Sequence, residues 1–163
     1  MTTMSSWSRE ERALFNPAFT ALVSARVVQG HAAAKHGPIC PLPIVVTAAV
    51  MALQPAVRAL LPATTGANMP KWAEDKEQIR VHMAANASAL SDVVRPGVLF
   101  ALQTGVLAVE SAGLTLRRRA IPATITGAAP TVVAIQKAAH MLGRWLPTAG
   151  DTAIALTLLG VRP

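Results

Sequence analysis

The sequence predicts a mainly α-helical fold with one small β-hairpin, in which a winged-helix-like helical domain is joined by further packing helices. Three observations predict this fold. Apolar residues recur at helical spacing along most of the chain. Prolines and glycines divide these stretches into separate segments. One stretch around residues 106–121 is rich in β-branched and apolar residues on both sides of Ser111-Ala112-Gly113, which is typical of a hairpin.

The composition favours one folded unit that is unusually apolar. Of the 163 residues, 52% are hydrophobic and only 14% are charged. A chain of this length can bury a large core, so we expect a single compact domain over residues 1–163. Within it we distinguish an N-terminal helical hairpin (17–62), winged-helix-like helices with a β-hairpin (68–121) and C-terminal helices (128–163).

The first clear helix is expected over residues 17–34. Asn16 can cap its N-terminus and Pro17 suits its first position. Arg26 falls on the apolar stripe of this helix, where a charged side chain is unusual. Two interpretations stay open: an arginine that is paired inside the protein, or a contact with a partner chain.

A long apolar segment follows at residues 39–53. Pro41 and Pro43 suit the first turn of a helix, and Pro55 ends that helix and begins a short one to Leu61. A membrane-spanning helix needs about 20 apolar residues, and this segment is shorter. We therefore expect a buried core helix and no membrane contact.

The most charged part of the chain, residues 71–83, indicates two short helices with Trp72, Ile79 and Met83 facing inward. Ser91-Asp92 resembles an N-cap, which predicts a new helix over residues 93–104 with Pro96 in its first turn. Three helices are thus expected between residues 70 and 104.

The predicted hairpin joins residues 106–110 to residues 114–121. Its second strand would carry Arg117, Arg118 and Arg119, with the first and third on one face and the second on the other. Three helices followed by a hairpin is the order of elements in a winged helix.

The C-terminal part predicts a long helix from Thr131, ended by Pro147, and a short terminal helix capped by Asp151. The terminal helix is almost entirely apolar, so we expect it to pack against another surface. Ile154 and Leu158 are therefore candidate partner-interface residues, together with Arg26.

The net charge of +7 is concentrated toward the C-terminus, since seven basic and two acidic residues lie from residue 95 onward. Such a surface suits phosphate or an acidic partner. The candidate contact residues are Arg95, Arg117, Arg118, Arg119, Lys137 and Arg144. A recognition helix usually displays polar groups, and the helix predicted over residues 93–104 has little beyond Gln103, so reading of specific bases is not expected.

No catalytic or metal-binding pattern is present, so we expect no enzyme activity, cofactor or metal. Cys40 is the single cysteine, which excludes an internal disulfide and a cysteine-based zinc cluster. His31 and His36 have no acidic residue or third histidine near them in sequence, which favours a solvated helix end. The start of the chain does not look like a signal peptide. These features indicate a cytoplasmic protein.

Three segments carry a family resemblance: RALFNPAFTALVSARVVQG (residues 12–30), PLPIVVTAAVMALQPAVRALLP (41–62) and LGRWLPTAGDTAIALTLLGVRP (142–163). Together they cover a little over a third of the chain. They resemble the middle component of bacterial three-component ABC-type conflict systems of the Lamassu-like kind.

The resemblance implies a small adaptor that links an ABC ATPase of the structural-maintenance-of-chromosomes or recombination-repair type to an effector, often a nuclease, in antiphage defence. It also implies non-specific contact with DNA through the complex. The phosphate-binding loop of an ATPase is missing from this sequence, which agrees with an adaptor. The alternative is a free winged-helix DNA-binding protein or regulator that uses the basic hairpin.

Overall fold

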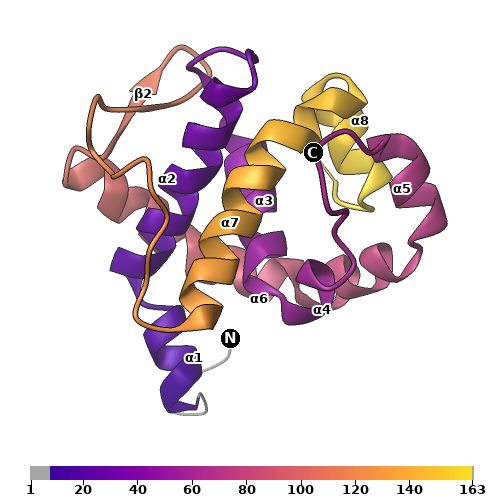
Figure 1. Cartoon of the computed structure of the whole chain (residues 1–163), viewed down its shortest axis with the longest axis horizontal. Coiled ribbons are helices and arrows are strands. Elements are labelled where there is room, and N and C mark those ends of the chain that lie inside the picture. Colours follow the sequence, from indigo (N-terminus) through magenta and orange to yellow (C-terminus); the bar gives the residue numbers. More distant parts are fainter. Residues whose placement is uncertain (1–7, 163) are drawn as a thin grey trace.

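The computed structural model describes residues 8–162. Helices dominate these residues, and a small sheet lies at one end of the molecule while α5 and α8 lie at the other (Figure 1). In chain order the elements are α1 Arg9–Leu14, α2 Pro17–Ala33, β1 Cys40–Pro41, α3 Leu42–Leu53, α4 Pro55–Arg58, α5 Met69–Asp75, α6 Gln78–Gln103, β2 Leu107–Glu110, β3 Gly113–Leu116, α7 Pro130–Trp145, the 3-10 helix η2 Leu146–Ala149 and α8 Thr152–Leu158.

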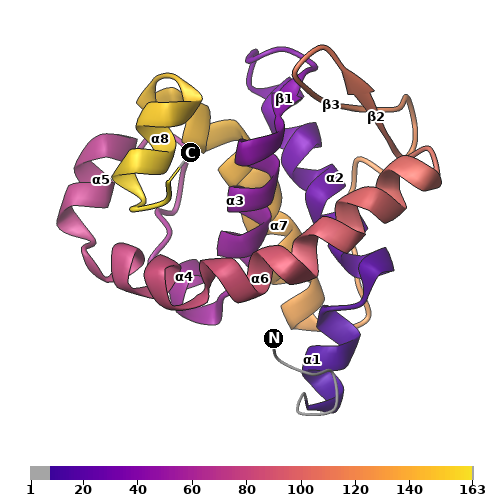
Figure 2. The ribbon, with the colours of Figure 1, turned by 180° about the vertical axis from the view of Figure 1, so that it is seen from behind.

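Helix α2 is the centre of the fold. Its N-terminus is capped as expected, because the Asn16 side chain accepts a hydrogen bond from the Ala18 N–H at 2.7 Å and Pro17 occupies the first turn. Helices α7, α6 and α3 all pack on it, and α6 crosses the molecule on the side seen in Figure 2. Most of α2 is therefore buried, including polar Thr20 and Ser24.

Two glycines allow α2 and α7 to approach each other closely. A Cβ atom at Gly30 of α2 would overlap the carbonyl oxygen of His140, and one at Gly143 of α7 would overlap the carbonyl oxygen of Val27. Each helix thus presents a glycine to the backbone of the other. The two glycines therefore let α7 lie directly against the backbone of α2.

The sheet has the strand order β1-β3-β2, and both pairings are antiparallel. The hairpin formed by β2 and β3 confirms the expected position. Strand β1 was not predicted: its Cys40 pairs with Leu114 and its Pro41 with Gly113. The second strand also ends earlier than expected, at Leu116.

The region before the hairpin differs most from the sequence-based expectation. The helix predicted to begin at residue 93 is the C-terminal half of α6, which runs without interruption for 26 residues. Ser91 does not cap a helix, since its hydroxyl donates to the Ala87 carbonyl at 2.7 Å one turn earlier. Pro96 lies in the helix interior, not in a first turn. Two helices, α5 and α6, stand where three were expected, so a winged helix is not confirmed.

The C-terminal elements agree with the sequence-based expectation and are held by two tryptophans. The rings of Trp72 and Trp145 meet edge to face, with centroids 4.9 Å apart. The Trp145 indole donates to the Ala67 carbonyl at 2.8 Å and that of Trp72 to the Leu60 carbonyl at 2.9 Å. These contacts join the end of α7 to the segment around α5.

The long apolar segment forms β1 and α3. Ile44, Val45 and most of the following residues of α3 are buried, which confirms a core helix. Among residues 8–162, no helix combines the length and apolarity needed to cross a membrane.

Two histidines near the α2–α7 crossing predict a pH-dependent stability. Burial lowers the pKa of both His31 and His140 from the ordinary value of 6.5; at His140 the nearby charges of Arg144 and Arg26 lower it further, while at His31 the bond to the Gly37 carbonyl opposes the shift. The unfolded chain therefore binds more protons below pH 6.5, and the free energy of unfolding should fall as the pH drops through about 6.5 toward 5. Urea unfolding across this range should show a falling midpoint. The variant with both His31→Gln and His140→Gln should show a flatter profile, and an equally steep one would contradict the assignment.

Candidate partner-docking site

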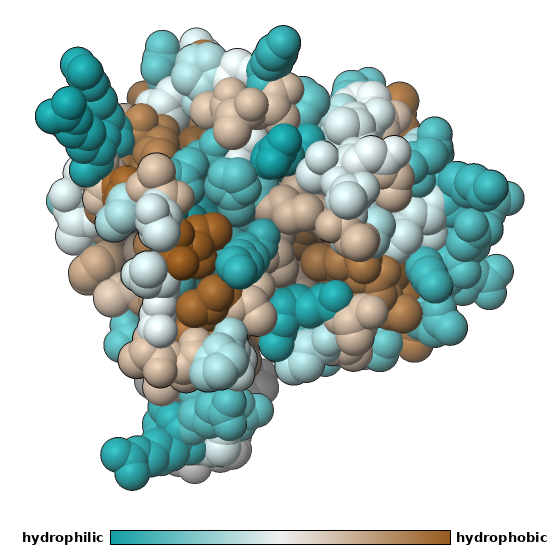
Figure 3. Space-filling model, viewed as in Figure 1, coloured by the Kyte–Doolittle hydropathy of each residue, from teal (hydrophilic) through white to brown (hydrophobic). Residues whose placement is uncertain are grey.

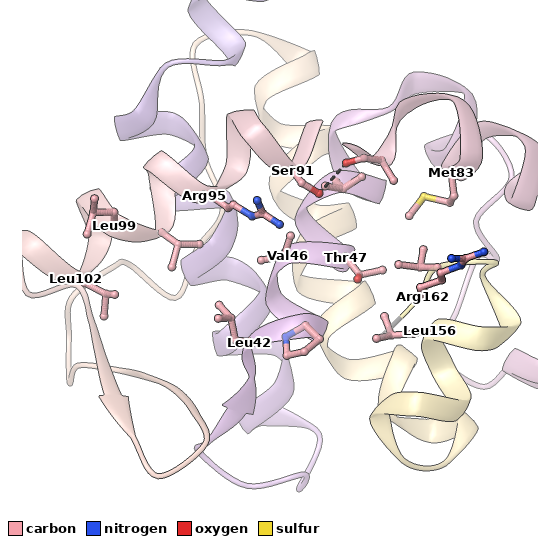
Figure 4. Close-up of a pocket in the computed structure, with 15 residues that line it drawn as sticks. Leu42, Val46, Thr47, Met83, Ser91, Arg95, Leu99, Leu102, Leu156 and Arg162 are labelled. Atoms are coloured by element: carbon pink, nitrogen blue, oxygen red, sulfur yellow. Dashed lines mark hydrogen bonds between the residues drawn. The ribbon is translucent and has the colours of Figure 1, made fainter. Parts of the chain in front are cut away.

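A largely apolar groove of about 520 Å³ lies between α3 and α6, with the C-terminal segment at one end (Figure 4). Helix α3 forms its floor and α6 forms one long wall. Leu156 of α8 closes the far end next to Arg162. The lining residues are Leu42, Pro43, Val46, Thr47, Val50, Met83, Ala87, Ser91, Arg95, Val98, Leu99, Leu102, Leu156, Val161 and Arg162.

The wall from α6 is one continuous stripe of the helix. Met83, Ala87, Ser91, Arg95 and Leu99 follow one another at intervals of four residues, so each lies one turn from the next, and together they form a row that winds gradually around α6 and lines the groove along its length. The stripe is continuous only because α6 passes through residues 91–96 without a break. From residue 83 to residue 102 it extends for roughly 28 Å at the helical rise of 1.5 Å per residue.

The groove exposes large apolar side chains to solvent. Leu42 on α3 is 45% exposed and Leu99 on α6 is 55% exposed. A single exposed leucine would be ordinary, but two that line the same apolar hollow are typical of an interaction surface. The groove is therefore suited to bind a partner's apolar side chains.

The predicted basic residues lie on three different parts of the fold. Arg95 lines the groove on α6, and its side chain is 72% exposed. Arg117, Arg118 and Arg119 are exposed but lie after β3, in a turn, so the expected alternation along a strand is wrong. Arg119 takes a left-handed backbone conformation there, with φ of 58°.

Lys137 and Arg144 are exposed on α7 and about 10 Å apart along the helix axis. Arg144 lines a shallow hollow with Lys35 and His36, and the His36 ring contacts the Arg144 carbonyl at 2.9 Å. Lys137 lines a different hollow. Hydrophilic side chains on this side of the molecule stand in separate groups with apolar areas between them (Figure 3).

Arg26 is buried, with 2% of its surface exposed. Its guanidinium donates to the Gln136 side-chain oxygen at 3.0 Å, the Gln29 side-chain oxygen at 2.9 Å and the Pro122 carbonyl at 2.5 Å, with a longer bond to the Thr124 carbonyl. Of the two interpretations of Arg26, the structure therefore supports the one in which the arginine is paired inside the protein. Two of the acceptors, the carbonyls of Pro122 and Thr124, lie in the segment between β3 and α7. The guanidinium is therefore used inside the protein and is not available to a partner.

The two apolar candidates on α8 have different surroundings. Ile154 is 47% exposed, and Asp151 caps the helix through the Ile154 N–H. Leu158 is partly buried against the core. The α8 residue that lines the groove is Leu156, which the sequence-based choice left out.

The side chains considered for catalysis or metal binding are either buried or hydrogen-bonded within the protein. Cys40 is fully buried, and burial raises the pKa of its thiol to about 12, so it is not a thiolate at neutral pH. His31 is 4% exposed and its Nδ1 contacts the Gly37 carbonyl at 2.8 Å, which corrects the expected solvated helix end. No group of three metal-ligating side chains occurs within residues 8–162.

Sequence reasoning found Arg95 but missed the rest of the groove. The sequence does contain a pattern that could have indicated the groove, because the lining residues 83, 87, 91, 95 and 99 recur at a spacing of four. This pattern was hidden because Ser91-Asp92 and Pro96 indicated a helix start, which cut the stripe in two. The floor on α3 was identified as core, and only the packing shows that Leu42 and Val46 reach the surface of that core.

Comparison with known proteins identifies one family. A family model described as ABC-three component (ABC-3C) system Middle Component 3 matches residues 4–163. Neither a curated protein nor a solved structure matches the chain.

Proposed function

The chain belongs to the ABC-three component system middle component 3 family, and from that premise we propose that it is a non-catalytic bridging subunit. It joins the ABC ATPase of its system to the effector. The ATPase is of the structural-maintenance-of-chromosomes or recombination-repair type, the effector is a nuclease, and the complex acts in antiphage defence in the cytoplasm. The family match, which spans nearly the whole chain, is the observation that carries the proposal.

Two features of the fold support a bridging role. The groove between α3 and α6 offers one binding surface, with Leu42 and Leu99 open to solvent. Exposed Ile154 on α8 offers a second apolar contact outside the groove. A bridge needs two separate contacts, one for each partner. The exposed arginines at residues 117–119 would add non-specific contact with DNA through the complex.

Co-expression of the three components of one system tests the proposal. The effector should be recovered on tagged ATPase when this chain is present and should be lost from it when the chain is omitted. Effector that binds the ATPase equally well without this chain would contradict the bridging role. So would a purified chain that binds neither component.

A further inference from the structure

The groove between α3 and α6 has the form of a receptor for a helix. Its floor and its long wall are rows of helical residues, formed by residues 42, 46 and 50 of α3 and by lining residues between 83 and 102 of α6. The side chains of a third helix can interdigitate with such ridges, and the length of the α6 stripe matches about five helical turns. An amphipathic helix laid in an apolar groove is a recurring mode of peptide recognition.

The charge of the lining indicates the chemistry of that helix. Arg95 and Arg162 line the groove, and none of the aspartates or glutamates within residues 8–162 does. Asp92 is the nearest acidic group on α6, but its carboxylate is 4.0 Å from Arg95 and both side chains are more than 70% exposed, so this pair is weak. Figure 4 shows Arg95 beside Val46 and Arg162 beside Leu156, which places the two charges at different points along the groove.

A third arginine, Arg80, lies beside the C-terminal segment, although it does not line the groove. The Nε of Arg80 donates to the Leu158 carbonyl at 3.2 Å, and the Arg80 side chain approaches Gly160, two residues before Arg162. A guanidinium is well suited to bind carboxylates at an interface. An apolar ligand with acidic residues on its flanks would complement this surface.

We propose that this groove binds an amphipathic helix of a partner component, with its apolar stripe seated between α3 and α6 and its acidic residues at Arg95 and Arg162. The inference rests on the proposed function, because it names the chemistry of the contact through which a bridging subunit would hold one of its partners. A second copy of this chain fits less well, since a chain of net charge +7 would bring positive charge to a positive groove.

The test measures binding of the purified full-length chain to the purified ATPase and effector of the same system. Leu99→Glu places a negative charge where the partner's apolar stripe would lie. The double variant Arg95→Glu, Arg162→Glu reverses the charge of the lining. Both should weaken the affinity for one of the two components by about tenfold or more.

Matched controls come from the same chain. Val81→Glu introduces the same charge at an apolar α6 residue that is 67% exposed and does not line the groove. Lys71→Glu reverses an exposed basic charge on α5, at a residue that does not line the groove. Both should retain the wild-type affinity within about twofold. All the variants lie at exposed positions, so their thermal unfolding should stay close to that of the wild type.

The outcomes separate the two proposals. If the wild type binds neither component, the proposed function fails and the inference fails with it. If the wild type binds but the groove variants match their controls, the groove inference is wrong and the bridging role stands. Loss with Leu99→Glu but not with the arginine variant would overturn the acidic character of the ligand. A wild-type homodimer that Leu99→Glu converts to monomer would assign the groove to a second copy and overturn the proposal.

Discussion

Replacing Gly143 with alanine should lower the free energy of unfolding by about 2 kcal/mol or more. The added Cβ would overlap the carbonyl oxygen of Val27, which is backbone of the neighbouring helix and cannot rotate away. The helices α2 and α7 would have to separate, and the buried residues along their contact would lose packing. In an exposed helix the same change would stabilise by up to about 1 kcal/mol, so the sign of the effect is diagnostic.

Gly66→Ala is the matched control. A Cβ at Gly66 would meet only the Thr64 hydroxyl at 3.6 Å, an ordinary contact. This variant should stay within about 0.5 kcal/mol of the wild type or gain slightly. Urea and thermal unfolding check both: the loss at Gly143 corresponds to a melting temperature lower by roughly 4 to 8 °C for a domain of this size. Equal stability of the two variants would show that α2 and α7 do not approach each other this closely.

The same crossing shows why local signals predicted α2 and α7 well. Asn16 and Pro17 mark the start of α2 by their own chemistry, and the helix begins where they place it. The end of α7 is set by Pro147 in the same way, because proline cannot continue the hydrogen-bond ladder. Signals of this kind need only a few neighbouring residues. The closeness of the two helices, in contrast, depends on residues 113 positions apart.

Helix α6 shows how local signals mislead. Ser91, Asp92 and Pro96 are the residues expected at a helix start, and in isolation they would favour one there. In the fold, α2 and α3 both pack on α6, and burial of Ile79 and Met83 before Ser91 and of Val94 and Ala101 after it favours a continuous helix. Tertiary packing thus overrides the local preference. The groove depends on this continuous helix, because its α6 wall runs through residues 91–96.

The hairpin was located correctly because Ser111-Ala112-Gly113 is a local turn signal. Its end was misplaced, since nothing local shows that pairing stops at Leu116. Strand β1 could not be predicted at all: it is two residues long, and its partner β3 lies more than 70 residues later in the chain. The basic residues were identified from the sequence, but their separation onto α6, the turn after β3 and α7 is a property of the fold.

Replacing Arg26 with methionine should lower the free energy of unfolding by about 2 to 4 kcal/mol. Methionine fills much of the space but donates no hydrogen bond. The Gln136 side-chain oxygen, which is buried, would lose its bond to the Arg26 Nε, and the carbonyls of Pro122 and Thr124 would lose theirs. The connection between β3 and α7 should therefore loosen as well as the core.

Trypsin offers a local measurement of that loosening, because the connection begins with Arg117, Arg118 and Arg119. Cleavage there should be faster in Arg26→Met than in the wild type under conditions where both are folded. Arg26→Lys should be intermediate, since an ammonium keeps the charge but lacks the fork of donors that reaches several oxygens at once. Arg144→Met, which removes an exposed arginine, should change neither the stability nor the cleavage rate at residues 117–119. If Arg26→Met left both quantities unchanged, the buried guanidinium would not be what holds the connection to α2.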